Sequence, residues 1–183
     1  MAGEPDSRRR GPIPASYWLI HGLLLAGEYP GADQHKTARK RLTNFLDAGI
    51  RTFIDLTEAG EGPPPYEPLL RRLATERGIE VKHVRHPVED MGLPRERDHM
   101  TRILTAIRAG IGAGTPVYVH CWGGIGRTGT VIGCWLVEEG LAGPAALERI
   151  AELRRGTGAS SIRSPETDAQ CRYVCEWLEI ESR

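Results

Sequence analysis

The 183-residue sequence lacks any apolar run that approaches the roughly 18 residues needed for a membrane-spanning helix. It also lacks an excess of charge, because 24 Lys and Arg residues balance 24 Asp and Glu residues. A formal net charge of zero gives no electrostatic reason to expect nucleic acid or a membrane surface as a partner. With 40% apolar and 26% charged residues, the composition is that of an ordinary soluble globular protein.

Cysteine is scarce, and the four cysteines do not have the paired spacing of a zinc site. The N-terminal stretch lacks the apolar centre of a signal peptide. We therefore expect a reducing cytoplasmic compartment, no metal and no cofactor. Residues 1–15 are expected to form a disordered tail, and residues 16–183 a single, monomeric domain. The sequence assigns no redox role to Cys134, Cys171 or Cys175.

Apolar periodicity predicts strands that alternate with helices. Strands are predicted around a turn within 18–30 and over 50–56, 79–88 and 117–119. Helices are predicted over 36–48, 66–77, 97–111, from 128 onward, over 144–155 and over 164–180. Ser164 is the predicted N-cap of the last helix, with Pro165 at its first position. The alternation predicts an α/β fold with a central, largely parallel sheet of four to five strands and helices on both faces.

The most informative stretch is PVYVHCWGGIGRTGT, which runs from Pro116 to Thr130. A short apolar strand leads to His120 and Cys121, a glycine-rich loop follows, and a helix is predicted after Arg127. Such a loop can turn successive backbone N–H groups toward one point, and the start of the helix adds further free N–H groups. The stretch therefore predicts a binding site for a tetrahedral anion.

Each part of this loop has an expected role. The backbone of the residues between cysteine and arginine would hold phosphate oxygens: Trp122, Gly123, Gly124, Ile125 and Gly126. Arg127 would add a planar pair of donors for two of these oxygens. Cys121 would place a thiolate, stabilised by the same donors, against the phosphorus atom. The alternative is a structural glycine turn with a buried cysteine, which leaves the arginine without a purpose.

The wording HCWGGIGRTGT resembles the signature of the cysteine-dependent protein tyrosine and dual-specificity phosphatases. It is most similar to the compact branch that contains the cyclin-dependent-kinase-inhibitor-associated phosphatases and bacterial tyrosine phosphatases. The resemblance implies a cysteinyl-phosphate intermediate and a general acid on a mobile loop that precedes the cysteine. The phrase EDMGLP resembles that acid loop, which assigns Asp90 as the acid and Glu89 as its fallback. The bland alternative for Asp90 is a solvated carboxylate in a turn.

Four further residues have a supporting role in this interpretation. His120 would orient the loop and favour the thiolate by hydrogen bonding or charge, unless it is a satisfied core histidine. Thr128 would donate to the sulfur, unless it is only a residue of the first helical turn. Gln170, in a phrase that resembles related phosphatases, would position the attacking water; the alternative is an exposed helix glutamine. Glu58 would form an ion pair with Arg127.

The predicted function is hydrolysis of a phosphomonoester by a protein-tyrosine or dual-specificity phosphatase. In the superfamily that this sequence resembles, phosphoinositide phosphatases tend to carry lysines inside the loop. The loop interior here has none, so the resemblance argues against a highly charged inositol lipid as substrate. His83 and His86 alternate on a strand, but no third metal ligand accompanies them. The alternatives are a phosphatase of a small non-protein phosphoester, a non-catalytic phosphopeptide-binding module and a rhodanese-like sulfurtransferase.

Overall fold

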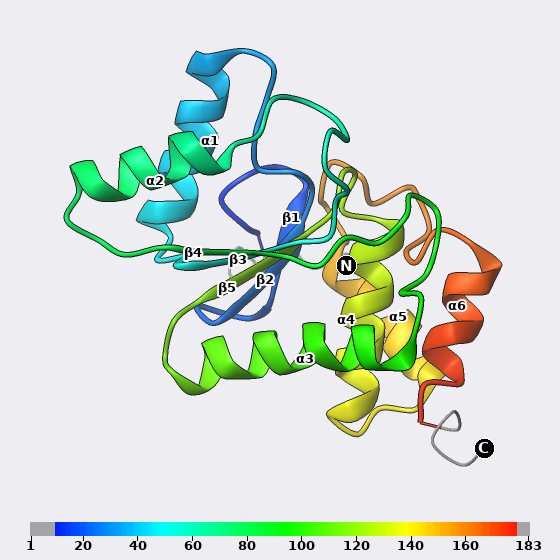
Figure 1. The fold of residues 1–183 in the computed structure, drawn as a ribbon. Helices are drawn as coiled ribbons and strands as arrows, with labels where there is room; N and C mark the ends of the chain where they lie inside the picture. The colour runs from blue at the N-terminus through cyan, green and yellow to red at the C-terminus, as the bar shows by residue number, and fades with distance from the viewer. Residues whose placement is uncertain (1–9, 179–183) are drawn as a thin grey trace, which may run out of the picture.

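The computed structural model describes residues 10–178, and it has a central five-stranded sheet (Figure 1). The strands lie in the order β1-β2-β5-β3-β4. Their bounds are Ser16–Ile20, Leu24–Gly27, Val117–His120, Thr52–Asp55 and Lys82–Arg85, respectively. Strands β1 and β2 are antiparallel, and every other neighbouring pair is parallel. The predicted largely parallel sheet is therefore confirmed.

Helices cover both faces of the sheet, as predicted (Figure 1). One face carries α1 (His35–Asp47) and α2 (Glu67–Glu76). The other carries α3 (Arg97–Gly112), α4 (Gly126–Glu138), α5 (Gly143–Leu153) and α6 (Asp168–Cys175). None of the helices among the described residues has the length and apolar character of a membrane span.

Strand β5 is central and its four residues are buried, which explains its nearly continuous apolar sequence. Its side chains alternate between two cores. Tyr118 packs with the residues of α1 and α2, whereas Val117 and Val119 pack with those of α3 and α4. This packing fixes the carboxyl end of β5 between the cores, and Cys121 follows directly after that end.

The chain termini differ from the sequence prediction. Residues 10–15 are not a free tail, because Ile13 is buried and Arg10 forms a β-bridge with Tyr17. The tail predicted for residues 1–9 lies outside the described residues. The last helix begins later than predicted, since its N-cap is Thr167 and not Ser164. The Thr167 and Gln170 side chains each accept a hydrogen bond from the other residue's backbone N–H, which closes a capping box.

Candidate active site

The loop between β5 and α4 folds back tightly on the sheet. Gly124 has a φ of 68°, and a Cβ added there would lie 2.3 Å from the Gly27 carbonyl carbon at the end of β2. A side chain at this position would therefore collide with backbone as well as strain the turn. Helix α4 begins at Gly126, two residues before the predicted start. Arg127 and Thr128 consequently lie in the first helical turn.

A cavity of about 210 Å³ opens above this loop. Cys121 lines it and is only 2% exposed, so its sulfur is reached only through the cavity. Of the predicted phosphate-binding residues, all except Gly124 line the same cavity: Trp122, Gly123, Ile125, Gly126 and Arg127. The structure therefore brings together the cysteine, the loop and the arginine of the predicted anion site.

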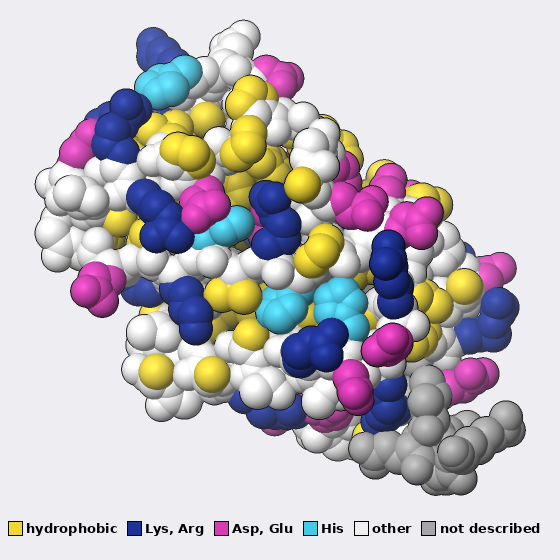
Figure 2. All heavy atoms as spheres, in the orientation of Figure 1, with side chains coloured by type: hydrophobic (Ala, Val, Ile, Leu, Met, Phe, Trp, Pro, Cys, Tyr) yellow, Lys and Arg dark blue, Asp and Glu magenta, His cyan; other side chains and the backbone are white. Residues whose placement is uncertain are grey.

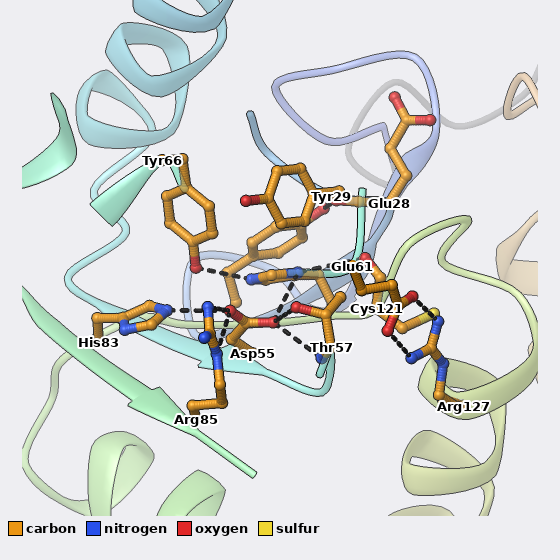
Figure 3. A network of polar contacts seen from close by, with 12 residues as sticks. Glu28, Tyr29, Asp55, Thr57, Glu61, Tyr66, His83, Arg85, Cys121 and Arg127 are labelled. Atoms are coloured by element: carbon orange, nitrogen blue, oxygen red, sulfur yellow. Dashed lines mark hydrogen bonds and ion pairs between the residues drawn. The ribbon is translucent and has the colours of Figure 1, made fainter. Parts of the chain in front are cut away.

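Arg127 is buried, and the Glu61 carboxylate holds its guanidinium in place (Figure 3). Its Nη1 donates to Glu61 Oε2 at 2.7 Å and to the Val88 carbonyl at 3.0 Å, and its Nη2 donates to Glu61 Oε1. This two-point pairing fixes the plane of the guanidinium. The prediction that Glu58 pairs with Arg127 is wrong: its described hydrogen bonds join its backbone to Glu61, whose carboxylate accepts from the Glu58 N–H and whose N–H donates to the Glu58 carbonyl.

The charges of this pair are mutually stabilised. Burial opposes ionisation of Glu61, but hydrogen bonds from Arg127 and from the Glu58 backbone hold the pKa of its carboxyl below the usual value. Burial also opposes the Arg127 charge, yet Glu61 and the nearby Cys121 and Asp90 raise the pKa of the guanidinium. Arg127 is therefore a permanent cation at the cavity floor.

Asp90 lies at the same cavity, with its Oδ1 2.9 Å from Arg127 Nη2 and with 67% of its side chain exposed. The fallback acid, Glu89, does not line the cavity. Next to Asp90, Met91 has a left-handed φ of 59°, which is strained for a residue with a side chain. The loop thus holds Asp90 against the arginine at some conformational cost.

Gln170 anchors the loop that carries Asp90. Its Nε2 donates to the Gly92 carbonyl at 3.0 Å, and its Oε1 accepts from the Glu166 and Thr167 backbone N–H groups. The side chain is fully buried and does not line the cavity, so the alternative of an exposed helix glutamine is wrong, and the water-positioning role of Gln170 stays a prediction. In this arrangement both ends of the amide are used, and Gln170 connects α6 to the loop after β4.

His120 is fully buried beneath the loop, and its Nε2 lies 2.7 Å from the Tyr66 hydroxyl. Its Nδ1 lies 3.3 Å from the Cys121 carbonyl, which can only accept a hydrogen bond. The proton must therefore be on Nδ1, with the Tyr66 hydroxyl donating to Nε2. Burial lowers the pKa of His120 to about 4, although Asp55 acts in the opposite direction. Near neutral pH His120 is therefore a neutral ring that contacts the Cys121 carbonyl, and its effect on the loop and the thiolate stays a prediction.

A buried polar cluster around Asp55, at the end of β3, was not predicted from the sequence (Figure 3). The Asp55 carboxylate accepts hydrogen bonds from Thr57, His83 and Arg85. Burial alone would raise the pKa of Asp55, but His83, His120 and Thr57 together hold it well below the usual value. The available signal was an aspartate ending a buried strand of a parallel sheet, where polar side chains gather.

The pKa of His120 predicts a pH-dependent stability. The unfolded histidine binds a proton below about pH 6.5, whereas the folded one does so only near pH 4. Between these values the unfolded state binds more protons, so the free energy of unfolding should fall as the pH falls, by up to about 1.4 kcal/mol per pH unit. His86 and His99, whose pKa values are also lowered, act in the same direction.

Urea unfolding of the wild type and of His120→Asn between pH 7 and pH 4.5 measures this contribution. The variant should show a shallower loss of stability with acidification, with a slope reduced by about one proton. Equal slopes in the two proteins would contradict a neutral, buried His120.

The remaining predicted groups occupy different environments. The Thr128 hydroxyl is buried and has no hydrogen-bond partner among the described residues, so no contact with the sulfur is present here. Cys134 is fully buried in the core, while Cys171 and Cys175 lie partly exposed on α6, and all are free thiols. Residues 10–178 hold no cluster of three or more metal-binding side chains, and His83 instead pairs with Asp55 and Glu67.

The surface charge is mixed on the face seen in Figure 2. There, basic side chains alternate with acidic ones and do not merge into one continuous patch. Of the described residues that line the cavity, Arg127 is the sole cation, and Asp90 and Glu166 are acidic. The positive charge that meets a ligand is therefore concentrated at the cavity floor.

Comparison with known proteins gives relatives that cover part or all of the chain. "Putative tyrosine phosphatase 067L" of Invertebrate iridescent virus 3 is 29% identical over 125 residues, which are 67% of this chain and 45% of that protein. Cyclin-dependent kinase inhibitor 3 of Rattus norvegicus is 24% identical over 96% of this chain and 84% of its own. The matches span only about half of the length of the first curated relatives, 45% to 57%.

Solved structures share the fold. Tk-PTP in its active form has a TM-score of 0.63 and 26% identity, with 93% of this chain and 98% of that chain covered. Kinase associated phosphatase (KAP), with its catalytic cysteine changed to serine, has a TM-score of 0.67 and 22% identity, with 87% of each chain covered. A family model described as "PTP-SAK: Swiss Army Knife protein, DSP-PTPase phosphatase domain" matches residues 14–173. With the fold, the cavity and this match together, the chain belongs to the family of DSP-PTPase phosphatase domains.

Proposed function

We propose that this chain hydrolyses phosphomonoesters as a protein-tyrosine or dual-specificity phosphatase, through a cysteinyl-phosphate intermediate. One observation carries the proposal: Cys121 and Arg127 line one small cavity, joined by a glycine-rich loop that ends at a helix N-terminus. A phosphate dianion fits the chemistry of that loop, and a nucleophile already lies at its floor.

In the first step the Cys121 thiolate attacks phosphorus, an S–P bond forms and the P–O bond to the leaving group breaks. Loop amides and Arg127 hold the remaining oxygens as negative charge spreads over them. Asp90 gives its proton to the leaving oxygen. In the second step water attacks phosphorus and gives a proton to Asp90, and the S–P bond breaks to release phosphate and the thiolate.

The contact between Asp90 and Arg127 supports this order of events. Asp90 Oδ1 forms an ion pair with Arg127 Nη2 at 2.9 Å, and both Nη atoms of the guanidinium donate to Glu61. A phosphate oxygen would compete with Asp90 for this donor. Since Asp90 is largely exposed and Glu61 is not, we expect Asp90 to be the group displaced, toward the leaving oxygen. Glu61 would stay and keep the guanidinium aligned.

Turnover of an aryl phosphate in excess chelator tests the proposed function. We expect release of phosphate and phenol in equal amounts, without added metal. Alkylation with iodoacetate should abolish turnover, and inorganic phosphate should protect against it, because both compete for the floor of one cavity. Ligand binding without turnover would instead support a phosphopeptide-binding module, and thiosulfate activity would support a sulfurtransferase.

Asp90→Asn should slow the reaction in a way that depends on the leaving group. An amide cannot supply a proton, so esters of weakly acidic alcohols should lose about 10²-fold or more in kcat/KM. Esters of acidic phenols, which leave without a proton, should lose much less. A series of aryl phosphates of graded phenol pKa measures this. A uniform loss across the series would contradict the role of Asp90, and Glu89→Gln is the matched control.

The substrate is a phosphorylated protein or a small phosphoester, and the proposal needs no metal or cofactor. A cytoplasmic location, a monomeric state and the absence of nucleic-acid or membrane partners stay predictions from the sequence.

A further inference from the structure

Two large apolar side chains are exposed at the mouth of the cavity. Trp122 is 46% exposed and Met91 is 50% exposed, and both line the cavity that ends at Cys121. They come from different loops, since Trp122 follows the cysteine and Met91 follows Asp90. Covering large apolar side chains that are half exposed to water has a favourable free energy, so these two side chains favour a ligand that packs on them. The mouth of the cavity thus presents two apolar side chains beside the exposed carboxylates of Asp90 and Glu166, whereas its floor carries the cation of Arg127.

The indole of Trp122 is held in place from behind. A Cβ added to Gly62 would lie 2.6 Å from a carbon of the indole ring, so the backbone of that loop lies against the ring. Gly62 has a φ of 78°, which only a residue without a side chain adopts easily. The backbone at Gly62 therefore covers one side of the Trp122 ring, and the exposed part of the side chain is left available at the cavity.

Tyr29 supplies the second support. Its ring lies 5.6 Å from the Trp122 ring, centroid to centroid, and its backbone N–H donates to the Trp122 carbonyl at 2.9 Å. Tyr29 is itself buried in the core beneath α1 and α2. Its hydroxyl reaches the carbonyl of Pro64, in the same loop as Gly62, at 3.4 Å. The indole is thus held in place by the core and by the loop that contains Gly62. Because the ring is already ordered, a ligand that packs against it pays little conformational entropy on binding.

We propose that Trp122 is a specificity-determining residue that packs against the aromatic ring of an aryl phosphomonoester. This inference rests on the proposed function and names the substrate class for the same site. With phosphorus at Cys121, an aryl spacer occupies the apolar mouth, and its ring meets the indole and the Met91 side chain. A phosphate on a short alkyl side chain would instead bring the polar peptide backbone of the substrate to the apolar mouth. The N–H and C=O groups of that backbone would then be poorly hydrated there.

The charges at the cavity argue in the same direction. Glu166 and Asp90 line the cavity beside the apolar groups, and Arg127 is committed to the reacting phosphate. A ligand with further phosphates would find no second cation among the lining residues. A ring with a single phosphate satisfies both the floor and the mouth.

The test compares two peptides that differ only in phosphotyrosine or phosphothreonine. The wild type should favour phosphotyrosine in kcat/KM. Trp122→Ala should lower the ratio of the two kcat/KM values by about tenfold, the size of a lost aromatic contact. Trp122→Phe should keep most of the ratio. Leu141→Ala, at an exposed leucine outside the cavity, is the matched control and should leave the ratio at its wild-type value.

Several results would overturn the inference without touching the proposed function. The first is an equal kcat/KM of the wild type for the two peptides. The second is a ratio of the two kcat/KM values that is the same in Trp122→Ala as in the wild type. A third is a Ki for inorganic phosphate that rises in Trp122→Ala as much as the phosphotyrosine rate falls, since the variant would then have damaged the anion site. Absence of turnover by the wild type on both peptides and on aryl phosphates would instead contradict the proposed function.

Discussion

Cys121→Ser is expected to lower kcat for an aryl phosphate by roughly four orders of magnitude or more, the scale seen when a covalent nucleophile is removed. The hydroxyl of serine keeps its proton near neutral pH, so it is a poor nucleophile where a thiolate is a good one. The substitution replaces a single sulfur atom by oxygen, and Cys121 is nearly buried at the cavity floor. The fold and the anion site should therefore persist.

Two measurements separate loss of chemistry from loss of structure. Inorganic phosphate should still bind to Cys121→Ser, and its unfolding midpoint should stay near that of the wild type. Cys175→Ser, a partly exposed cysteine on α6, is the matched control and should keep full activity. Turnover by Cys121→Ser at the wild-type rate would contradict covalent catalysis by this residue.

Arg127→Lys is expected to lower kcat/KM by roughly 10²- to 10³-fold, in spite of the conserved charge. Lysine offers a point charge on a flexible stem, whereas the guanidinium presents a planar set of donors. In this chain that plane is fixed by Glu61 at both Nη atoms and by the Val88 carbonyl. A lysine cannot keep all of these contacts and also hold a phosphate oxygen.

The same assay on Arg39→Lys provides the control, because Arg39 is exposed on α1 and pairs only with Glu76 in its described contacts. That variant should behave as the wild type. Activity of Arg127→Lys within threefold of the wild type would mean that the positive charge alone suffices. It would contradict a need for the planar guanidinium that Glu61 and the Val88 carbonyl hold in place.

The sequence was sufficient for the features whose cause is local. The apolar run before Cys121, the glycines after it and the helical pattern beyond predict the strand, loop and helix that are found. The parallel sheet is likewise predicted from a local feature, the alternation of strands and helices along the chain. Helix ends were less predictable: Ser164 and Thr167 are both good N-caps, and the capping box with Gln170 decided between them.

Contacts between distant loops could not be predicted. Glu58 and Glu61 lie in one turn, and only the path of that loop decides which carboxylate reaches Arg127. The Gln170 contact with Gly92 likewise depends on how α6 packs beside the loop after β4. The support of Trp122 by Gly62 joins two segments for which the sequence has no shared motif. Such pairings follow from tertiary packing and leave no periodic pattern.

The central claim is that Cys121 carries the phosphoryl group between two chemical steps. Rapid acid quench of the enzyme during turnover of an aryl phosphate, followed by peptide mass analysis, measures this directly. We predict a burst of phenol and a peptide containing Cys121 that gains the mass of one phosphoryl group. Steady turnover with no burst and with that peptide unmodified would contradict the account.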